Sequence, residues 1–533
     1  MNVKELEIPL DSEKTKRYRF FEILPGALSW SILAFPFVMS EINAAVTALF
    51  ILAFFLMWFA RAVGLNIRVL QGWHRLQKYQ RYDWSVFIDE LEAMEIPDRS
   101  SAPKWHVDNI RRLQETPALL KPSEVIHAII IPTHTDGRAI LEPTIKYIID
   151  SKFDIKKTIF VLTYEERAGE HIEKECKDLV KEYGKYFRHA IATKHPKDLL
   201  NEVKGKGPNG NWGCRRLKEY LDEENIDPKQ VIVTMFDADN RPHPNYFGVL
   251  TYMVASTINP VRASYQPVPI YTNNIWDAPA LMRVIATGNS FWNVVISMRP
   301  HMIRNFASHA QSMQGLIETD YLSARTVVED GHQFWRSYFA FEGKYDVYPM
   351  YVSVFQDAVL APTYRKTIKE QFIQLRRWAY GASDVAYVAE KGFFTKNKIS
   401  KVDVTFKFLR LLEGHVSWAT APLILALAAF IPLLFNPDDY VANQLPILVS
   451  RIQTVAMIGI FITLFLSFKV LPPKPKRYKA HRNIFMVLQW VLLPITTIVF
   501  SSFAALNSQT RLIFKRYLNT FDATIKHVKT DND

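Results

Sequence analysis

The chain is poor in cysteine and has no internal repeat. Its 533 residues include two cysteines, Cys176 and Cys214, which form no CxxC motif and have no histidine nearby at the spacing of metal ligands. A disulfide-stapled secreted module is therefore excluded, and we expect a reduced, cytosolic environment around these residues. With 49% hydrophobic and 22% charged residues, the composition also excludes a disordered tail and a collagen-like fibre.

Basic residues outnumber acidic ones, 65 against 53, which gives a formal net charge of +12 and a pI near 9.3. They lie largely beside apolar runs and in linkers, so they do not indicate binding to nucleic acid. The chain has 35 Phe, 23 Tyr and 12 Trp, yet its mean hydropathy is only -0.05. This combination indicates membrane segments beside a soluble domain.

Two apolar runs near the N-terminus predict a helical hairpin in a membrane. Residues 23–40 and 42–60 carry no charged side chain and are separated only by Glu41. Each has about the ~20 residues that cross a bilayer as a helix. Basic residues flank the pair on both sides, so both flanks are expected in the cytoplasm. A cleaved signal peptide is not expected, because the second run follows at once.

Three more apolar runs occupy residues 415–435, 452–468 and 484–510. The loop 436–450 has no Lys or Arg, whereas 472–483 is basic, which places the first loop outside and the second inside. Counting then puts the C-terminus outside, although the tail is basic. One interpretation is that the last run, with Pro494 near its middle, is a broken or re-entrant pair of half-helices; the alternative is a single crossing.

Between these groups of runs, five short apolar strands alternate with helical stretches. The strands are expected at 127–131, 158–163, 231–236, 263–270 and 347–354. This order predicts a mostly parallel sheet with ligands at the carboxyl ends of its strands. Residues 61–121 read as an amphipathic helical linker, with Trp73, Trp84 and Trp105 available for the membrane interface.

Polar residues follow the first two strands and a later glycine-rich segment. Thr133 and Asp136 lie in a turn where a nucleotide could dock, although these are ordinary turn residues. The second strand ends in three charged residues, Glu165, Glu166 and Arg167. The alternative to a functional role is that they form a solvated run of charges. The basic, glycine-rich segment 204–212 is interpreted as a loop that either follows a diphosphate or is a flexible part of the surface.

Two carboxylate motifs follow. Asp237 and Asp239 come directly after an apolar strand, in the spacing that can present oxygen ligands to a divalent cation such as Mg²⁺. Asp330 ends the sequence Val-Val-Glu-Asp before an aromatic-rich helical stretch. Taken singly, the first motif is compatible with a turn and the second with a helix cap.

A third motif, Gln374-Leu-Arg-Arg377-Trp378, lies in an amphipathic helical stretch ahead of the third apolar run. Arginine offers a fixed fork of donors to a phosphate, and tryptophan offers a flat apolar face to a sugar ring. The alternative is an interfacial helix with Arg and Trp among lipid headgroups.

Together and in this order, the motifs resemble those of the membrane-embedded, inverting glycosyltransferases of family 2, most closely the processive branch of cellulose and hyaluronan synthases. The resemblance covers about residues 125–378. It implies an α/β GT-A (Rossmann-like) catalytic domain framed by α-helical transmembrane segments. It also implies a multi-pass protein of the cell membrane whose catalytic domain is cytoplasmic and uses Mg²⁺ or Mn²⁺.

The expected segments then follow along the chain. They are a cytoplasmic N-terminal segment (1–22), two transmembrane helices (23–60), the linker (61–121), the GT-A domain (122–380), interfacial helices (381–414), about three transmembrane or re-entrant segments (415–510) and a basic, cytoplasmic tail (511–533).

The resemblance also assigns roles to individual residues. Asp237 and Asp239 match the donor- and metal-binding DxD motif, and Asp330 matches the general base of the TED motif. The residues matching the acceptor- and diphosphate-binding motif are Gln374, Arg377 and Trp378. The donor-side matches are Thr133, Asp136, Glu165 and Lys206, with Lys206 and Asn211 resembling a GKxxxLN loop. Residues 521–526 resemble the FxVTxK gating segment of cellulose synthases.

This sequence departs from the family at three places. The PTYNE turn reads PTHTD, Val328 replaces the Thr of TED, and Glu165 or Glu166 stands where the family has Asp. The implied activity is transfer of sugar from a nucleotide-diphosphate donor, a UDP-sugar by preference, to a growing polysaccharide, with export coupled to synthesis. The alternatives are transfer of one sugar to a lipid carrier or glycolipid, and an inactive membrane scaffold.

The partners implied are the nucleotide-sugar donor, a carbohydrate or lipid-linked acceptor, and membrane lipids. About five spans are few helices for a channel formed by a single chain, so an export partner or an oligomer is also considered.

Overall fold

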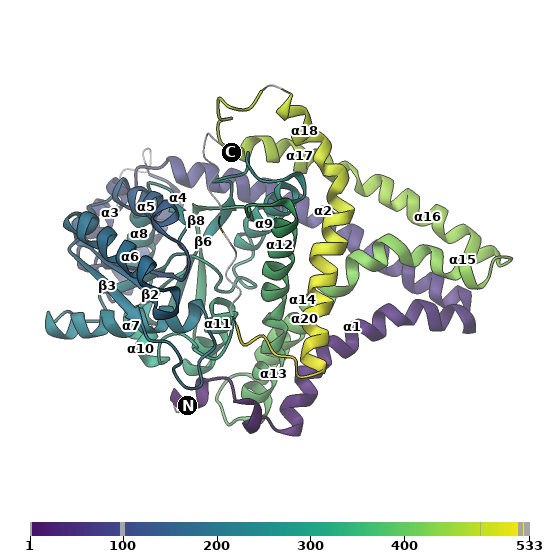
Figure 1. Cartoon of the computed structure of the whole chain (residues 1–533), viewed down its shortest axis with the longest axis horizontal. Helices are drawn as coiled ribbons and strands as arrows, with labels where there is room; N and C mark the ends of the chain where they lie inside the picture. The colour runs from purple at the N-terminus through teal and green to yellow at the C-terminus, as the bar shows by residue number, and fades with distance from the viewer. Residues whose placement is uncertain (1–2, 96–101, 480, 521–525, 527–533) are drawn as a thin grey trace.

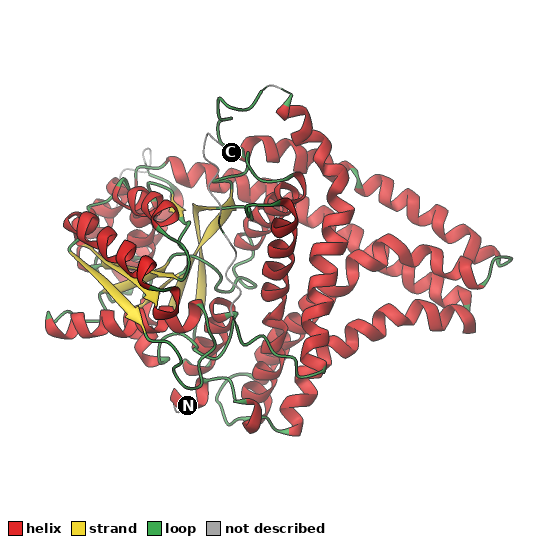
Figure 2. Ribbon diagram, viewed as in Figure 1, coloured by secondary structure: helices red, strands yellow, loops and turns green. Residues whose placement is uncertain are grey.

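The computed structural model describes residues 3–95, 102–479, 481–520 and 526. An α/β domain forms one end of the molecule, and long helices extend from it toward the other (Figure 1). Figure 2 shows that the strands are confined to the α/β end. The expected class, an α/β domain framed by long apolar helices, is confirmed.

The domain is built on one eight-stranded mixed sheet with the order β3-β2-β1-β4-β7-β6-β8-β5. Neighbours from β3 to β4 are parallel, while β7 pairs antiparallel with β4 and β6. The strands are β1 (Ile126–Thr133), β2 (Thr158–Glu165), β3 (His189–His195), β4 (Val231–Met235), β5 (Arg241–Pro242), β6 (Ala263–Tyr271), β7 (Ala310–Ser312) and β8 (Asp346–Gln356).

All five strands predicted from the sequence are present, but three others were missed. The edge strand β3 has an exposed or half-buried residue at most positions, so it lacks the continuous apolar run of a buried strand. β5 and β7 have two and three residues, which is too short for a periodic pattern.

Helices cover both faces of the sheet. Ile129 and Ile131 of β1 pack on one face with residues of α5, α6 and α8, while Ile130 packs on the other face with residues of α7 and α10. The helices of this part are α5 (Arg138–Ile149), α6 (Glu170–Tyr183), α7 (Lys206–Glu223), α8 (Tyr246–Ala255), α9 (Ala280–Ser297), α10 (Met313–Glu318), α11 (Glu329–Ala340), α12 (Tyr364–Ala379) and α13 (Asp384–Ala389).

Five helical segments are long and apolar enough to cross a membrane. They are α1 (Lys16–Ile42), α2 (Ala44–Arg81), α14 (Lys401–Leu427) with α15 (Ile431–Phe435), α16 (Tyr440–Ala456) with α17 (Ile458–Val470), and α18 (Arg482–Leu488), α19 (Leu493–Ile495) and α20 (Phe503–Ile513) with the turns between them. The last segment does not double back at Pro494, so the re-entrant interpretation is wrong, although the segment is divided into short helices there. The helical path continues past Pro494 through a 3₁₀ turn at Gln489–Leu492 and π turns at Thr496–Ser502.

The linker helices belong to the α/β domain rather than to the membrane surface. α2 continues to Arg81, followed by α3 (Trp84–Ala93) and α4 (Lys104–Glu115). Trp84 is only 4% exposed and lies in an aromatic cluster with Tyr79 and Trp105. The expectation of a position at the membrane interface is therefore wrong for Trp84, which is buried where α3 packs against α8, while Trp73 and Trp105 are half-buried.

The glycine-rich segment is also not a loop, because α7 begins at Lys206. A Cβ atom on Gly207 would lie 2.8 Å from the carbonyl oxygen of Ser323, and one on Gly213 would lie 2.9 Å from Ile130 Cγ2. The glycines therefore allow α7 to pack closely on the sheet. This packing gain outweighs the low helix propensity of glycine.

Candidate active site

The ten predicted site residues all line one cavity at the carboxyl ends of β1, β2 and β4. They are Thr133, Asp136, Glu165, Lys206, Asp237, Asp239, Asp330, Gln374, Arg377 and Trp378. The carboxyl ends of parallel strands meet at one edge of a sheet, which explains how residues far apart in sequence converge. α7, α11 and α12 complete the wall.

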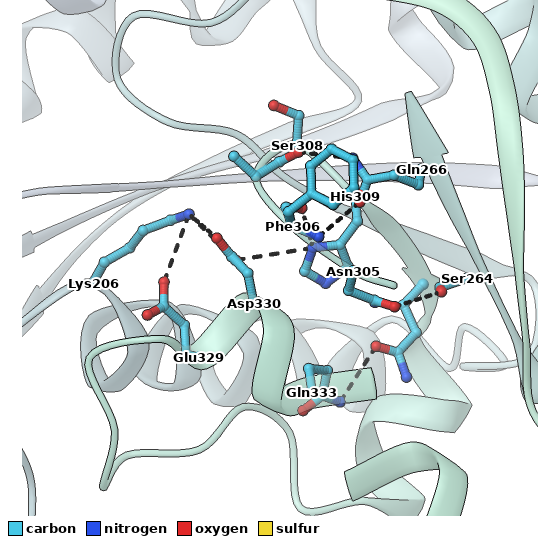
Figure 3. Close-up of polar contacts among 12 residues, drawn as sticks. Lys206, Ser264, Gln266, Asn305, Phe306, Ser308, His309, Glu329, Asp330 and Gln333 are labelled. Carbon is cyan, nitrogen blue, oxygen red and sulfur yellow. Dashed lines mark hydrogen bonds and ion pairs between the residues drawn. The ribbon is translucent and has the colours of Figure 1, made fainter. Parts of the chain in front are cut away.

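Lys206, the first residue of α7, joins three carboxylates. Its Nζ lies 2.9 Å from Asp237 Oδ1, 3.3 Å from Asp330 Oδ2 and 3.7 Å from Glu329 Oε1. Figure 3 shows Lys206 facing Glu329 and Asp330. Burial opposes the charge on Lys206, but Asp237, Asp330 and Glu329 outweigh it and raise the pKa of the ammonium group. The site therefore keeps a fixed positive charge between its acidic groups.

Burial likewise opposes ionisation of Asp237, but Lys206 and Lys526 outweigh it and hold the pKa of Asp237 below its ordinary value. Asp136 behaves differently. Burial raises the pKa of Asp136, and the charge of Lys526 offsets this only in part. The two carboxyl groups thus lie in one cavity, where the pKa of Asp237 is lowered and the pKa of Asp136 is raised.

Glu329 and His309 flank Asp330 and were not identified from the sequence. Burial, reinforced by the charge of Asp330, raises the pKa of Glu329 to about 7. His309 Nδ1 lies 3.1 Å from the carbonyl oxygen of Phe306 and 3.9 Å from Asp330 Oδ1 (Figure 3). A carbonyl only accepts, so this contact assigns the proton to Nδ1. Burial lowers the pKa of His309, which favours the neutral ring.

The second carboxylate of the DxD motif, Asp239, has two partners. Its Oδ1 lies 2.8 Å from Lys526 Nζ, and its Oδ2 accepts a hydrogen bond from the backbone N–H of Asp357 at 3.0 Å. Asp357 lines the same cavity, and burial together with the charge of Asp239 raises its pKa to about 7. Asp357 follows a predicted strand, so its position in the sequence could have identified it as a candidate site residue.

Asn209 connects the ends of β1 and β2. Its Nδ2 donates to the carbonyl oxygens of Thr133, at 2.9 Å, and Thr163, at 3.2 Å. The Thr133 hydroxyl donates to the Asp136 carbonyl, so it stabilises the turn. Glu165 forms an ion pair with Arg167 at the edge of the cavity.

Asn211 does not belong to this cavity. It is buried and donates to the carbonyl oxygen of Leu322, while its own oxygen accepts from Arg215 at 2.8 Å. The match of Asn211 to a donor-binding loop is therefore not supported by its position. Asn209, two residues earlier on α7, lines the cavity instead.

α12 contributes three residues to the cavity. Gln374, Arg377 and Trp378 are spaced by three and four residues and thus share one helix face. The ring of Trp378 lies 6.2 Å from that of Tyr271, at an interplanar angle of 42°. Together these rings offer an aromatic wall beside the carboxylates.

The oxygen atoms of Asp237 and Asp239 fit a hard divalent cation that takes its remaining ligands from phosphates and water. Asp357 Oδ1, beside Asp239, is buried and has no hydrogen-bond partner among the described residues. Within the same part of the chain, no three His, Cys, Asp or Glu side chains form a metal-binding group. Protein ligands alone therefore do not complete a metal cage here.

The remaining expected segment of the tail, residues 521–525, lies outside the described residues, and only Lys526 is placed.

No family model matches the sequence, and no curated protein matches it. The structure is similar in part to the mannosyltransferase PcManGT from Pyrobaculum calidifontis in complex with GDP-Man and Mn2+, with 13% identity over 76% of this chain and 98% of that chain and a TM-score of 0.41. It is also similar in part to S. aureus TarS 1–349 in complex with UDP-GlcNAc, with 8% identity, 74% and 92% coverage and a TM-score of 0.37. Both scores are too low to support a conclusion about fold or activity.

Proposed function

We propose that the protein is an inverting, metal-dependent glycosyltransferase of GT-A type that transfers sugar from a nucleotide-diphosphate donor. The observation that supports this most is the convergence of Asp237, Asp239 and Asp330 with Arg377 and Trp378 on one cavity. This reaction needs two carboxylates that bind the metal–diphosphate complex and a third that accepts a proton. It also needs a fixed positive charge and an aromatic face.

The reaction is a single in-line displacement at the anomeric carbon of the donor. Asp330 takes the proton of the acceptor hydroxyl as its oxygen forms the new glycosidic bond, and the bond to the diphosphate breaks with its electron pair on the leaving oxygen. Trp378 stacks against the acceptor sugar and holds it in line. A divalent cation bound by Asp237 and Asp239 would neutralise charge on the diphosphate.

Lys206 and Arg377 supply positive charge from the chain itself. Lys206 contacts Asp330 at 3.3 Å, so the proposed base is held by an ammonium group in this state. A bound diphosphate offers Lys206 a competing anionic partner. We expect Lys206 to turn toward the diphosphate, which leaves the Asp330 carboxylate free to accept a proton and adds to Arg377 in stabilising the leaving group.

A growing polysaccharide remains the proposed acceptor, with a UDP-sugar as the proposed donor and export coupled to synthesis. The α/β domain is proposed to face the cytoplasm, where nucleotide sugars are available, next to membrane helices that could lead a polymer outward. The second candidate is transfer of a single sugar to a lipid carrier or glycolipid, which the position of the cavity beside apolar helices also allows.

The proposal is tested by nucleotide diphosphate release from the purified protein over a panel of nucleotide sugars, with Mg²⁺, Mn²⁺ or chelator, and by sizing the product. Metal-dependent turnover of one donor into a long product supports a processive synthase. A single-sugar adduct supports the second candidate. Absence of donor binding in calorimetry would contradict both and would favour an inactive membrane scaffold.

A further inference from the structure

A cluster of arginines lies outside the candidate active site, where three segments distant in sequence meet. It consists of Arg61 and Arg68 of α2, Arg299 after the end of α9, and Arg410 of α14. Arg61 directly follows the apolar run 42–60, and Arg410 shortly precedes the apolar run 415–435. The cluster therefore lies at the ends of two membrane segments, at the level of the lipid headgroups, and the basic flanks predict that this side is cytoplasmic.

An ion pair joins α2 to α14 at this level. Arg61 Nη1 lies 2.6 Å from Glu413 Oε1, and Arg410 precedes Glu413 by three residues on α14. Residues three apart are neighbours on the surface of a helix. Arg410 therefore lies beside the carboxylate that binds Arg61.

The end of α9 lies against the same helix, α2. A Cβ atom on Gly72 would lie 3.0 Å from Met298 Cγ, so α2 contacts the residue directly before Arg299. Arg68 lies one turn before Gly72, on the same face of α2. This contact places Arg68 and Arg299 near each other.

The acid–base properties of the loop after α9 show that the positive charges face one another. Burial, reinforced by the charges of Arg68 and Arg61, lowers the pKa of Arg299. Burial and the charges of three of the arginines, with Arg410 the foremost, lower the pKa of the adjacent His301. Like charges that are close together disfavour the protonated form. The three segments therefore direct positive charge to one place.

Three of the four guanidinium groups have no acidic partner among the residues that the structure describes. Arg68 donates to the carbonyl oxygen of Gly64 at 3.0 Å, and Arg299 donates to Met302 Sδ at 3.9 Å. Arg410 is exposed and forms no ion pair in the described part of the chain. Four positive charges thus share one carboxylate, and the excess charge favours an anion.

Exposed apolar side chains flank the cluster on both membrane helices. Leu56 and Ile67 of α2 are each 51% exposed, while Phe406 and Leu409 of α14 are 60% and 52% exposed. A soluble anion would use only the charges of this surface. A molecule with an anionic head and apolar chains would use both the charges and the apolar side chains.

We propose that the arginine cluster binds the phosphate group of an anionic phospholipid, whose acyl chains lie along the exposed apolar side chains of α2 and α14. Arginine offers phosphate a planar fork of donors. Basic sites between membrane helices on the cytoplasmic side are typical binding sites for such headgroups. Arg299 belongs to the α/β domain and Arg410 to a membrane helix, so one lipid phosphate connects the domain to the membrane helices.

The first test is native mass spectrometry of the full chain in detergent, titrated with phosphatidylglycerol or with the zwitterionic phosphatidylcholine. Arg410→Gln and Arg299→Gln each remove one charge from the cluster. Lys476→Gln is the matched control, since it removes one charge from the exposed basic loop 472–483. We expect the wild type to bind several-fold more phosphatidylglycerol than phosphatidylcholine, both cluster variants to lose most of this preference, and the control to keep it.

Arg410 is exposed, so its replacement should leave the fold intact, which the melting temperature checks. Equal binding of the two lipids by the wild type would overturn the proposal. So would an unchanged preference for phosphatidylglycerol in both cluster variants.

The second test separates a lipid from a soluble phosphate compound. Glycerol 3-phosphate carries a phosphate group without acyl chains, and we expect a hundred-fold excess of it to leave phosphatidylglycerol bound. Displacement of the lipid by this compound would assign the cluster to a soluble ligand and overturn the proposal. Neither readout depends on turnover, so the result is independent of the proposed function.

Discussion

At the scale of residues, the site consists of charged side chains that form ion pairs with one another. Lys206 lies within 3.7 Å of three carboxylates, and Lys526 lies 2.8 Å from Asp239. Buried charges are tolerated only when they are paired, so the two lysines compensate the negative charge of these carboxylates. Asp330 itself contacts Lys206 at 3.3 Å and lies 3.9 Å from His309.

Asp330→Asn tests the proposed base. The amide keeps the size of the side chain but cannot accept the proton, so we expect the turnover rate to fall by about 10²–10⁴. Nucleotide-sugar binding, measured by calorimetry, should persist. Asp346→Asn, at an exposed position at the start of β8, is the control and should turn over normally. Normal turnover of the Asp330 variant would exclude it as the base.

Glu329→Gln tests the influence of the neighbouring carboxyl group. The pKa of Glu329 is about 7, so it is neutral below that pH and ionises as pH rises through it. The new negative charge favours proton uptake by an adjacent carboxylate, and we expect the wild-type rate to rise through this range. The variant is neutral throughout and should lose that inflection in a pH–rate profile. An unchanged profile would mean that Glu329 does not titrate there.

At the scale of elements, α7 determines the position of both Lys206 and Asn209. Its first turn packs against the segment before α11, where Gly207 approaches Ser323 and Glu329. The strand ends, α7 and α11 therefore act as one unit, and a shift of α7 moves Lys206 relative to Asp237 and Asp330.

Gly207→Ala should disturb this unit. The added Cβ meets a backbone carbonyl at 2.8 Å, which cannot rotate away, so we expect destabilisation of about 1–3 kcal/mol and a loss of activity. Gly288→Ala in α9 is the matched control, because no atom lies within 4 Å of its Cβ. That change should be neutral or stabilising by up to about 1 kcal/mol. Thermal unfolding and turnover of both variants provide the measurement, and equal melting temperatures would refute the packing argument.

At the scale of the whole molecule, the C-terminal part of the chain contacts the edge of the sheet where the candidate site lies. Lys526 reaches Asp239, and the chain at Thr520 pairs with Lys204 just before α7. The membrane helices, the tail and the α/β domain are therefore connected at the site itself.

Lys526→Met tests this connection. Removing the ammonium group frees Asp239 for a cation, so we expect Mn²⁺ to bind several-fold more tightly in the presence of a nucleoside diphosphate. Asp239→Asn should weaken Mn²⁺ binding, and Lys515→Met, an exposed lysine of the same tail, should leave it unchanged. Electron paramagnetic resonance of free Mn²⁺ gives the affinity. Identical affinity in the Lys526 variant and the wild type would show that the ion pair does not compete with metal.

The sequence by itself determined the apolar segments, the five longer strands and the candidate residues at the strand ends. These depend on local composition, and the parallel order brings the strand ends together. Only the tertiary structure decided that residues 206–212 are helical, that Trp84 is buried, and that His309 and Asp357 join the site. It also decided the direction of Arg482–Ile513. Each of these depends on contacts between segments distant in sequence, and neither a hydropathy pattern nor a motif records which surfaces pack against one another.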